Sequence, residues 1–374
     1  MKTATAIPSV TAKVEKNTLI IWSDNPLRVL SSAVLSGGFK EANCIVNVGV
    51  SENCGNDKHD EHWNAETFLK MHVSKLSLPE QKTVGLMTAA KMQNLAISSQ
   101  TSGRIKITMF ITAGTSIAVT AGEPVGLTEG SSLPTRCGTI NIIAIIDGNL
   151  TQSCMVDAVK TITEAKTVAL RELDVRSRFS GELASGTMTD SVAVACTGQG
   201  DLIRYAGTFT TLGELLGKSV REATKNAILK QDNLRSDRSL TERLEERGIS
   251  LEEVLNLSSG PEIEEQPHEK SPQLKMRLEE LLNDPKIASL VLAGFKLDED
   301  RNSSLIPCGQ SKRSVEDVIF LRIMENVLQA YAAKNKVKAD VPRMSSDVMT
   351  SKKMGFLSRL ILSNVLKEAL SQIS

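Results

Sequence analysis

Apolar residues in the first part of the chain form short runs that are separated by breaks containing glycine. Short aliphatic runs between such breaks predict β-strands. The runs are Leu19 to Trp22, Cys44 to Val50, Val84 to Thr88, Ile105 to Thr112, Ile140 to Ile146 and Ser191 to Ala195.

Two longer segments, 151–173 and 211–229, carry apolar residues at spacings of three, four and seven and predict helices. Each opens at a threonine suited to N-capping, Thr151 and Thr211, and Glu214 stands at capping-box distance from Thr211. Strands and helices in mixed order predict an α/β or α+β domain with a mixed sheet and packed helices.

The strand pattern stops after about residue 230. Residues 231–247 are charged and predict a helix, and Ser250 with Glu253 predicts another helix start. Residues 258–272 are rich in Pro, Glu and Ser, which is typical of a linker. Helical spacing resumes in 274–282, 286–295, 315–333 and 356–373. The sequence therefore predicts a sheet domain over 1–230 and an all-α domain over 231–374.

Charge and cysteine usage narrow the class of protein. The 44 basic and 44 acidic side chains cancel, so the chain has no electrostatic footprint for nucleic acid or an anionic membrane. No apolar run is long enough to span a bilayer, and the polar start lacks the apolar region of a signal peptide. Six scattered cysteines without a CxxC pair predict free, mostly buried thiols and a cytoplasmic protein.

Motifs rich in glycine and threonine follow one another along residues 1–230. They are Ser36-Gly37-Gly38, Asn47-Val48-Gly49-Val50, Gly85-Leu86-Met87-Thr88-Ala89-Ala90, Thr112-Ala113-Gly114, Gly138-Thr139-Ile140-Asn141, Thr163-Glu164-Ala165-Lys166-Thr167, Ser185-Gly186-Thr187-Met188-Thr189-Asp190, Tyr205-Ala206-Gly207-Thr208 and Leu212-Gly213-Glu214. In content and order they resemble the adenosylcobinamide amidohydrolase family. The resemblance implies hydrolysis of the amide between the corrin propionyl arm and aminopropanol, giving adenosylcobyric acid for corrinoid salvage. The corrinoid is then the small-molecule substrate.

Amide hydrolysis needs a nucleophile, donors for the oxyanion and an acid for the leaving amine. Turns of Gly and Thr before strands present N–H groups and hydroxyls that suit this chemistry. With the resemblance, they predict catalytic groups at Thr139, Asn141, Glu164, Lys166, Thr187 and Asp190. Substrate contacts are predicted at Asn47, Gly138, Gly186, Thr189, Thr208 and Glu214.

Two of these predictions have a structural alternative. Asp190 is predicted to act as a base toward water or a threonine, but the same residues also suit an Asx or ST turn that shapes a strand entry. Glu164 and Lys166 are two apart in a helix and so point to different faces. Lys166 lies near the apolar stripe, where a lysine either serves a polar site or extends to solvent.

A metal ligand set is not assigned. His59, Asp60, Glu61 and His62, with His72 further on, have the residue types of a metal site, but their polar surroundings favour a solvated loop. The sequence leaves open whether a divalent metal is needed and whether the chain is a homo-oligomer. Cys154 and Cys196 lie on apolar faces and are predicted to pack as small core residues.

The second domain resembles the α-ribazole-5′-phosphate phosphatase related to phosphatidylglycerophosphatase A, through Asp284 to Leu290, Glu316 to Leu321 and Lys352 to Leu357. That family's Asp-Glu pair is Met324-Glu325 here, its following Gly is Leu328, and its Lys-Pro-Gly is Lys353-Met354-Gly355. No acid lies between Gly355 and Lys367 to supply its later acidic pair.

Phosphoryl hydrolysis needs carboxylates to hold a metal ion, so we expect this second activity to be lost or strongly impaired. A bifunctional enzyme and a non-catalytic corrinoid-binding protein are the alternatives, and residues 1–230 are predicted to suffice for amide hydrolysis.

Overall fold

The structure is a computed structural model that describes residues 2–3, 5–50, 64–124, 138–256 and 272–305, with 358, 361–363, 365–366 and 369. The chain separates into two compact units, residues 1–236 and 237–374. The predicted boundary between residues 230 and 231 lies inside the last turn of α3 (Thr211–Asp232), because this helix continues beyond its apolar stripe. Among the described residues, no helix is long and apolar enough to cross a membrane.

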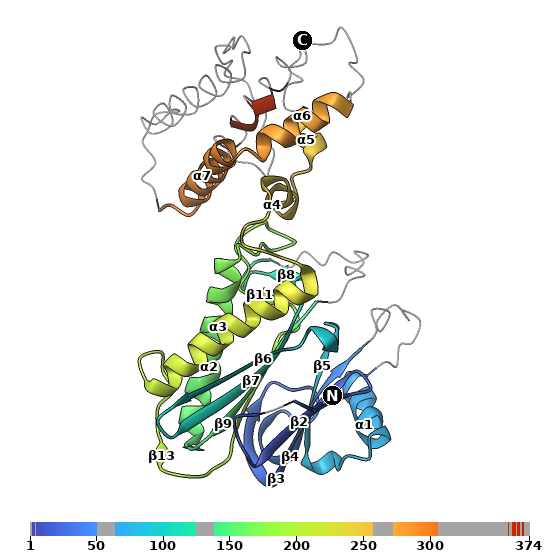
Figure 1. Ribbon diagram of the computed structural model, residues 1–374, viewed down its shortest axis with the longest axis vertical. Coiled ribbons are helices and arrows are strands. Elements are labelled where there is room, and N and C mark those ends of the chain that lie inside the picture. The colour runs from blue at the N-terminus through green and yellow to red at the C-terminus, as the bar shows by residue number, and fades with distance from the viewer. Residues whose placement is uncertain are drawn as a thin grey trace. The chain divides into compact units, whose positions relative to one another are not determined.

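The first unit is built on a nine-stranded sheet (Figure 1). Its strands are β1 (Lys2–Thr3), β2 (Val10–Glu15), β3 (Thr18–Ser31), β4 (Gly38–Gly49), β5 (Thr83–Thr88), β6 (Ala96–Ser102), β7 (Ile105–Ala113), β9 (Ile140–Asp147) and β12 (Ser191–Cys196). The order is β1-β2-β3-β12-β9-β7-β6, and β4 pairs with both β3 and β5. The β4–β5 and β9–β12 pairs are parallel and the others antiparallel, which confirms the predicted mixed sheet.

Four further strands make two small sheets at the margins of this unit. β8 (Ala118–Val119) pairs with β11 (Gly186–Thr187), and β10 (Asn149–Leu150) pairs with β13 (Leu202–Ile203). The β8–β11 pair bears on the predicted site because it holds one of the predicted glycine and threonine motifs against α2 (Gln152–Glu172).

Side-chain alternation along β9 directs its apolar residues into two of the three apolar clusters that the described residues of the first unit form. Ile142, Ala144 and Ile146 of β9 face a core shared with α2 and α3, whereas Ile143 and Ile145 face a core shared with β3, β4 and β5. A register shift in β3 between Trp22 and Leu27 marks an irregularity, and such irregularities bend strands. Residues of β4 and β5 share a core with Phe110 of β7 and with Ile143 and Ile145 of β9, so these two strands lie over one face of the sheet.

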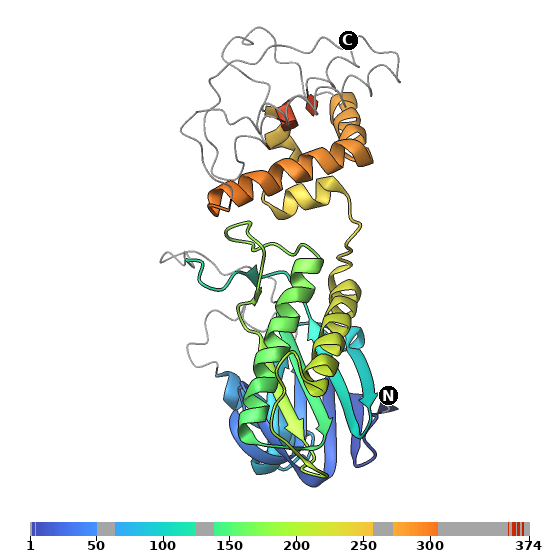
Figure 2. The ribbon, with the colours of Figure 1, turned by 90° about the vertical axis from the view of Figure 1, so that its left-hand side faces the viewer.

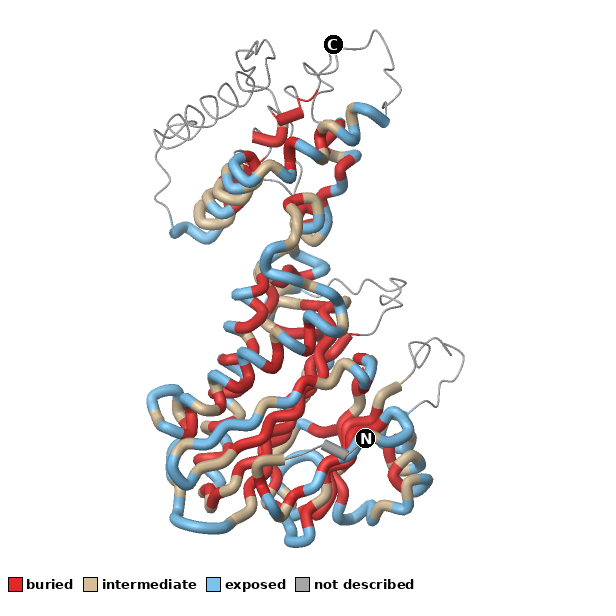
Figure 3. Tube along the Cα trace, in the orientation of Figure 1, coloured by how far each residue is buried: buried red, intermediate tan, exposed pale blue. Residues whose placement is uncertain are grey.

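The strands of the first unit form two layers, with β4 and β5 in one and β9 and β7 in the other. Helices cover the outer face of each layer. α2 and α3 lie side by side on one face (Figure 2) and α1 (Ala65–Lys75) covers β4 and β5 through Leu69 and Val73. Buried positions are concentrated on the strands and on the inner faces of these helices (Figure 3).

The helix starts match the sequence prediction at one helix and differ at the other. The Thr151 side chain accepts from the Cys154 N–H and caps α2, as predicted. For α3 the N-cap is Thr210, which accepts from the Gly213 N–H, so the prediction of Thr211 was wrong by one residue. Glu214 consequently forms no capping box and instead pairs with Lys218 at 2.5 Å.

The second unit is helical wherever it is described, in α4 (Leu240–Glu246), α5 (Leu251–Leu255), α6 (Pro272–Leu282) and α7 (Pro285–Asn302). Ser250 and Glu253 form the predicted capping box. Asn233, with φ at 52°, ends α3 in the left-handed region, and residues 233–239 are not helical, so the helix predicted over 231–247 is broken. The linker predicted over 258–272 lies outside the described residues except for Pro272, which begins α6. The helix predicted over 315–333 lies wholly outside them, so an all-α unit stays a prediction.

Candidate active site

The parallel strands β9 and β12 begin at the same edge of the sheet, and the predicted site motifs stand at this edge. Asn141 pairs in register with Ser191, and Thr139 and Asp190 lie just before the two strands. Lys166 reaches the same place from the second turn from the end of α2. The fold thus brings together residues from three separate motifs.

Lys166 and Asp190 form the central ion pair of this edge. The Lys166 ammonium donates to Asp190 Oδ2, and only 8% of the lysine side chain and 14% of the aspartate side chain are exposed. Buried charges are rare unless they are paired, because removing an ion from water is costly. The prediction that Lys166 and Glu164 occupy different faces is confirmed, since Lys166 is buried and Glu164 is exposed.

The second oxygen of Asp190 is also occupied. Asp190 Oδ1 accepts from the Thr187 hydroxyl at 2.5 Å and from the Ile140 N–H at 3.1 Å. All three partners of the carboxylate are donors, as an ionised carboxylate requires. The Thr187 hydroxyl, the Asp190 carboxylate and the Lys166 ammonium therefore form a continuous row of contacts.

Glycine at position 186 permits this arrangement. A Cβ on Gly186 would lie 2.7 Å from Lys166 Nζ and closer still to Asp190 Oδ2. Any side chain there would displace the ion pair, because real Cβ atoms do not approach other atoms so closely. Gly186 therefore leaves room for the ion pair, whereas a larger residue at this position would have to shift the ends of the Lys166 and Asp190 side chains.

Threonine 139 ties the start of β9 to the turn before β12. Its hydroxyl donates to the Thr189 carbonyl at 2.8 Å, and its own carbonyl accepts from the Gly114 N–H at 3.0 Å. Gly138 packs so tightly that a Cβ would lie 2.7 Å from the Gly114 carbonyl oxygen. Thr139 and Gly138 thus shape the site from the side of β7.

A buried polar network lies on the opposite face of the same strand ends. Asn141 Nδ2 donates to Asn47 Oδ1 at 2.9 Å and to the Met87 carbonyl at 2.6 Å, and Asn47 Nδ2 donates to Thr112 Oγ1 at 3.0 Å. The Thr112 hydroxyl in turn lies 3.3 Å from Thr88 Oγ1. Among the described residues, no donor reaches Asn141 Oδ1, although this oxygen is buried.

Thr88 and Thr112 were missed as site residues by sequence reasoning, although both stand in quoted motifs. A signal existed. Each threonine takes the next alternate position after buried apolar residues of its strand, Leu86 for Thr88 and Phe110 for Thr112. Period two therefore aims both hydroxyls into the layer between the sheets.

Three predicted residues do not join these contacts. Glu164 lies on the exposed face of α2, Thr208 is exposed before α3, and the Glu214 side chain is 60% exposed in its pair with Lys218. Their predicted roles rest on the motif alone.

In the part of the chain that the structure describes, the metal-ligating side chains form no metal site and the cysteines form no reactive thiol site. There, no group of three His, Cys, Asp or Glu side chains is placed to hold a metal ion. His59, Asp60, Glu61 and His62 lie outside that part, and His72 Nε2 is 2.9 Å from Thr18 Oγ1. Cys44, Cys154 and Cys196 are buried free thiols, as predicted. Burial raises the pKa of Cys44 to about 12 and that of Cys154 to about 11, so neither is a ready nucleophile.

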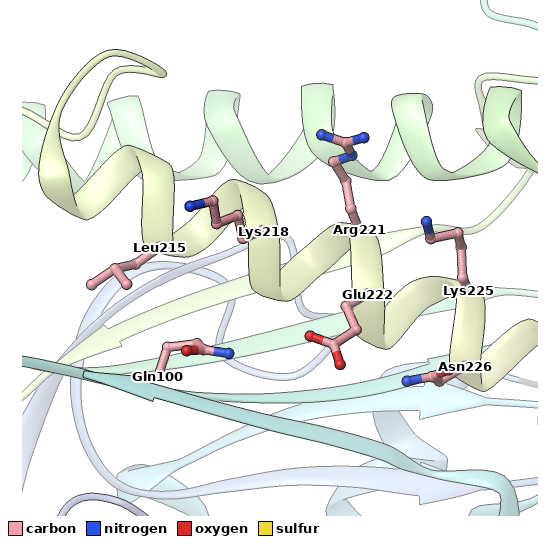
Figure 4. A pocket seen from close by; sticks show the side chains of 7 residues that line it. All are labelled: Gln100, Leu215, Lys218, Arg221, Glu222, Lys225 and Asn226. Atoms are coloured by element: carbon pink, nitrogen blue, oxygen red, sulfur yellow. The ribbon is translucent and has the colours of Figure 1, made fainter. Parts of the chain in front are cut away.

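A surface hollow of about 410 Å³ lies between α3 and β6 (Figure 4). Its lining residues are Gln100, Leu215, Lys218, Arg221, Glu222, Lys225 and Asn226. None of them belongs to the motifs around Asp190, and its three cations are already paired, Lys218 with Glu214 and the other two with Glu172. The hollow therefore does not mark the position of the candidate active site around Asp190.

Comparison with known proteins decides the family. A family model described as adenosylcobinamide amidohydrolase matches residues 2–236, more than half of the chain. The chain belongs to this family. The match spans the whole first unit and includes every motif that surrounds Lys166 and Asp190.

Two further proteins are similar to this chain over more than half of its length. An uncharacterized protein of Methanocaldococcus jannaschii is 32% identical over 235 residues, covering 59% of this chain and 89% of its own. The adenosylcobinamide amidohydrolase of Methanosarcina mazei is 29% identical over 224 residues, covering 58% of this chain and 96% of its own. These alignments contain about as many residues as the first unit alone.

Among solved structures, the PH0078 protein of Pyrococcus horikoshii is 13% identical, with a TM-score of 0.31 over 61% of this chain and 80% of that one. A likeness of this size does not establish a shared fold. The family match ends at residue 236, so the resemblance of the second unit to a phosphatase stays a prediction.

Proposed function

We propose that this protein hydrolyses the amide of adenosylcobinamide to adenosylcobyric acid and aminopropanol. Membership of the family and the likeness to the amidohydrolase of Methanosarcina mazei support this reaction. One water molecule is consumed, since its OH goes to the acyl carbon and its remaining proton to the nitrogen of aminopropanol.

The contact between Thr187 and Asp190 carries the proposal. A hydroxyl 2.5 Å from a carboxylate oxygen is placed to lose its proton to that oxygen during attack. Asp190 then holds the proton and delivers it to the leaving nitrogen, so that the amine departs neutral. The Lys166 ammonium stabilises the carboxylate before and after the transfer, because it lies against the other oxygen.

Two nucleophiles fit this geometry. In the first route Thr187 Oγ1 adds to the acyl carbon, the C–N bond breaks, and water then cleaves the resulting ester to the acid. In the second route Thr187 orients a water molecule, and Asp190 removes the proton of that water as it attacks. Both routes need Asp190 as the base.

The reaction is tested by incubating the full-length protein with adenosylcobinamide and separating the products by chromatography. We expect adenosylcobyric acid and aminopropanol in equal amounts. A corrinoid that binds to the protein but is recovered unchanged would favour the alternative of a non-catalytic corrinoid-binding protein.

Thr187→Ala addresses the role of the hydroxyl. We expect turnover to fall about 10²–10⁴-fold, the usual cost of losing a positioned catalytic group. The matched control is Thr163→Ala on the exposed face of α2, where the hydroxyl donates only to the Val159 carbonyl. Similar turnover in the two variants would reassign the Thr187 turn to a purely structural role.

For the second unit we propose that phosphatase activity is absent. The support is the sequence, in which Met324 replaces one acid of the expected pair. The thioether of methionine does not ligate a hard cation such as Mg²⁺, which takes oxygen ligands. The test is phosphate release from α-ribazole-5′-phosphate with Mg²⁺ or Mn²⁺, which we expect to be absent. Metal-dependent release that Glu325→Gln abolishes would show a working site and favour the bifunctional alternative.

A corrinoid salvage enzyme of this kind would act in the cytoplasm on a small-molecule substrate. This placement rests on the cysteine usage and on the substrate class, and it is checked by fractionating cells that express the full chain.

A further inference from the structure

The last turn of α3 holds the loops that follow two strands of the candidate site. Gln231 Oε1 accepts from the Lys91 N–H at 3.0 Å and from Asn94 Nδ2 at 2.8 Å, in the loop after β5. Asp232 Oδ2 accepts from the Thr115 N–H at 2.7 Å and from the Thr115 hydroxyl at 2.8 Å, in the loop after β7. β5 and β7 are the strands that carry Thr88 and Thr112.

A continuous path of short contacts leads from Asp232 to the candidate base. Thr115 is bonded to Asp232 and follows Gly114, whose N–H donates to the Thr139 carbonyl at 3.0 Å. The Thr139 hydroxyl donates to the carbonyl of Thr189 at 2.8 Å, and Thr189 precedes Asp190. Each step of this path is either a peptide bond between neighbouring residues or one hydrogen bond. We therefore expect a shift of Thr115 to move Asp190 as well.

An aspartate in the last turn of a helix is unfavourable by itself. The carbonyl end of a helix carries partial negative charge, which favours cations and disfavours carboxylates. As a whole residue Asp232 is exposed, but the surrounding atoms desolvate its carboxylate, and this desolvation raises its pKa while the Thr115 bonds lower it. The position of Asp232 within α3 therefore does not explain why an aspartate stands there. Its hydrogen bonds to Thr115, in the loop after β7, do explain it.

We propose that Asp232 is a positioning residue of the hydrolytic site, acting through Thr115, Gly114 and Thr139 on the turn that carries Asp190. The inference rests on the proposed amide hydrolysis. It also assigns the end of α3, next to the second unit in the chain, to the machinery of the first unit.

The test uses three full-length variants, Asp232→Ala, Asp232→Asn and Glu222→Ala. One oxygen of Asp232 accepts both Thr115 bonds, so the amide oxygen of asparagine can replace it. Glu222 is an exposed acid of the same helix that lines the hollow and serves as the matched control.

We expect Asp232→Ala to lower kcat about ten- to hundredfold with little change in KM, since a misplacement of a reacting group by about 1 Å can cost about 10²-fold in rate. Asp232→Asn should recover most of kcat, and Glu222→Ala should match the natural protein. A kcat for Asp232→Ala equal to that of Glu222→Ala, or no recovery in Asp232→Asn, would overturn the proposal.

Hydrogen exchange keeps the positioning claim separate from the reaction. Peptides covering 138–141 and 186–190 should exchange faster in Asp232→Ala than in Glu222→Ala, with or without substrate. If the natural protein yields no adenosylcobyric acid, the proposed function fails while this readout still decides the positioning. Unchanged exchange in both peptides would contradict it.

Discussion

Lysine and arginine side chains on two neighbouring helices show opposite behaviour. On α2, Lys166 turns inward and pairs with Asp190, and both side chains are largely buried. On α3, Lys218, Arg221 and Lys225 turn outward beside the 410 Å³ hollow, and their side chains are 69%, 47% and 38% exposed. The hollow and the buried Lys166–Asp190 pair are therefore in different places.

The difference teaches where chemistry can occur. An exposed ion pair is screened by water and contributes little, whereas a desolvated pair interacts strongly and must be held in one geometry. The buried Lys166–Asp190 pair has a hydroxyl at 2.5 Å from its carboxylate and a glycine that makes room for it. This contrast makes α2, and not the hollow on α3, the centre of the proposed function.

Replacing Lys166 should have the largest effect on stability. Lys166→Met leaves the buried Asp190 without its cation, and breaking one side of a buried pair costs about 3–5 kcal/mol. Lys160→Met is the control, because Lys160 lies on the same helix in an exposed pair with Asp157. Its loss should be much smaller, because water screens an exposed pair. Urea unfolding of both variants measures the difference, and equal losses would remove the contrast.

Gly186→Ala should mainly reduce turnover. The new Cβ displaces Lys166 and Asp190 from each other, and a misplacement of about 1 Å can cost about 10²-fold in rate. Gly217→Ala in α3 is the control, since a Cβ there meets no atom and alanine stabilises a helix by about 0.5–1 kcal/mol. Product formation by both variants is the measurement. If Gly186→Ala keeps its turnover, the tight packing at Asp190 is irrelevant to catalysis.

Sequence reasoning found the residues of the site better than their connections. Lys166 could be singled out because a lysine on an apolar stripe needs a reason to be there. Its partner Asp190 is 24 residues away and Asn47 is 94 residues from Asn141, so these contacts depend on the strand order.

Elements with a polar composition escaped the sequence prediction. β6 reads Ala96-Ile97-Ser98-Ser99-Gln100-Thr101-Ser102 and is half exposed at the edge of the sheet, so its period-two signal is weak. Asp232 was assigned to the second domain because the apolar stripe of α3 ends before it. Asp232 and Thr115 are 117 residues apart in the sequence, and the packing of α3 on β7 brings them into contact.

Substitutions in the hollow should have the smallest effect. Arg221→Ala and Lys225→Ala each remove one exposed partner of Glu172, and such pairs are worth about 0–1 kcal/mol. We expect normal turnover and small changes in the free energy of unfolding for both. A strong rise in KM in either variant would show that the hollow binds the corrinoid and would reverse the comparison.

Asp190→Asn tests the central claim most directly, with Asp157→Asn in the exposed pair of α2 as its matched control. Asparagine keeps the shape of the side chain but cannot take a proton from Thr187 or water, so the conversion of adenosylcobinamide in a single turnover should slow about 10²–10⁴-fold. Circular dichroism should show the same folded content in both variants, and Asp157→Asn should convert substrate at the natural rate. Conversion by Asp190→Asn at the natural rate would show that hydrolysis occurs without this carboxylate and would contradict the account.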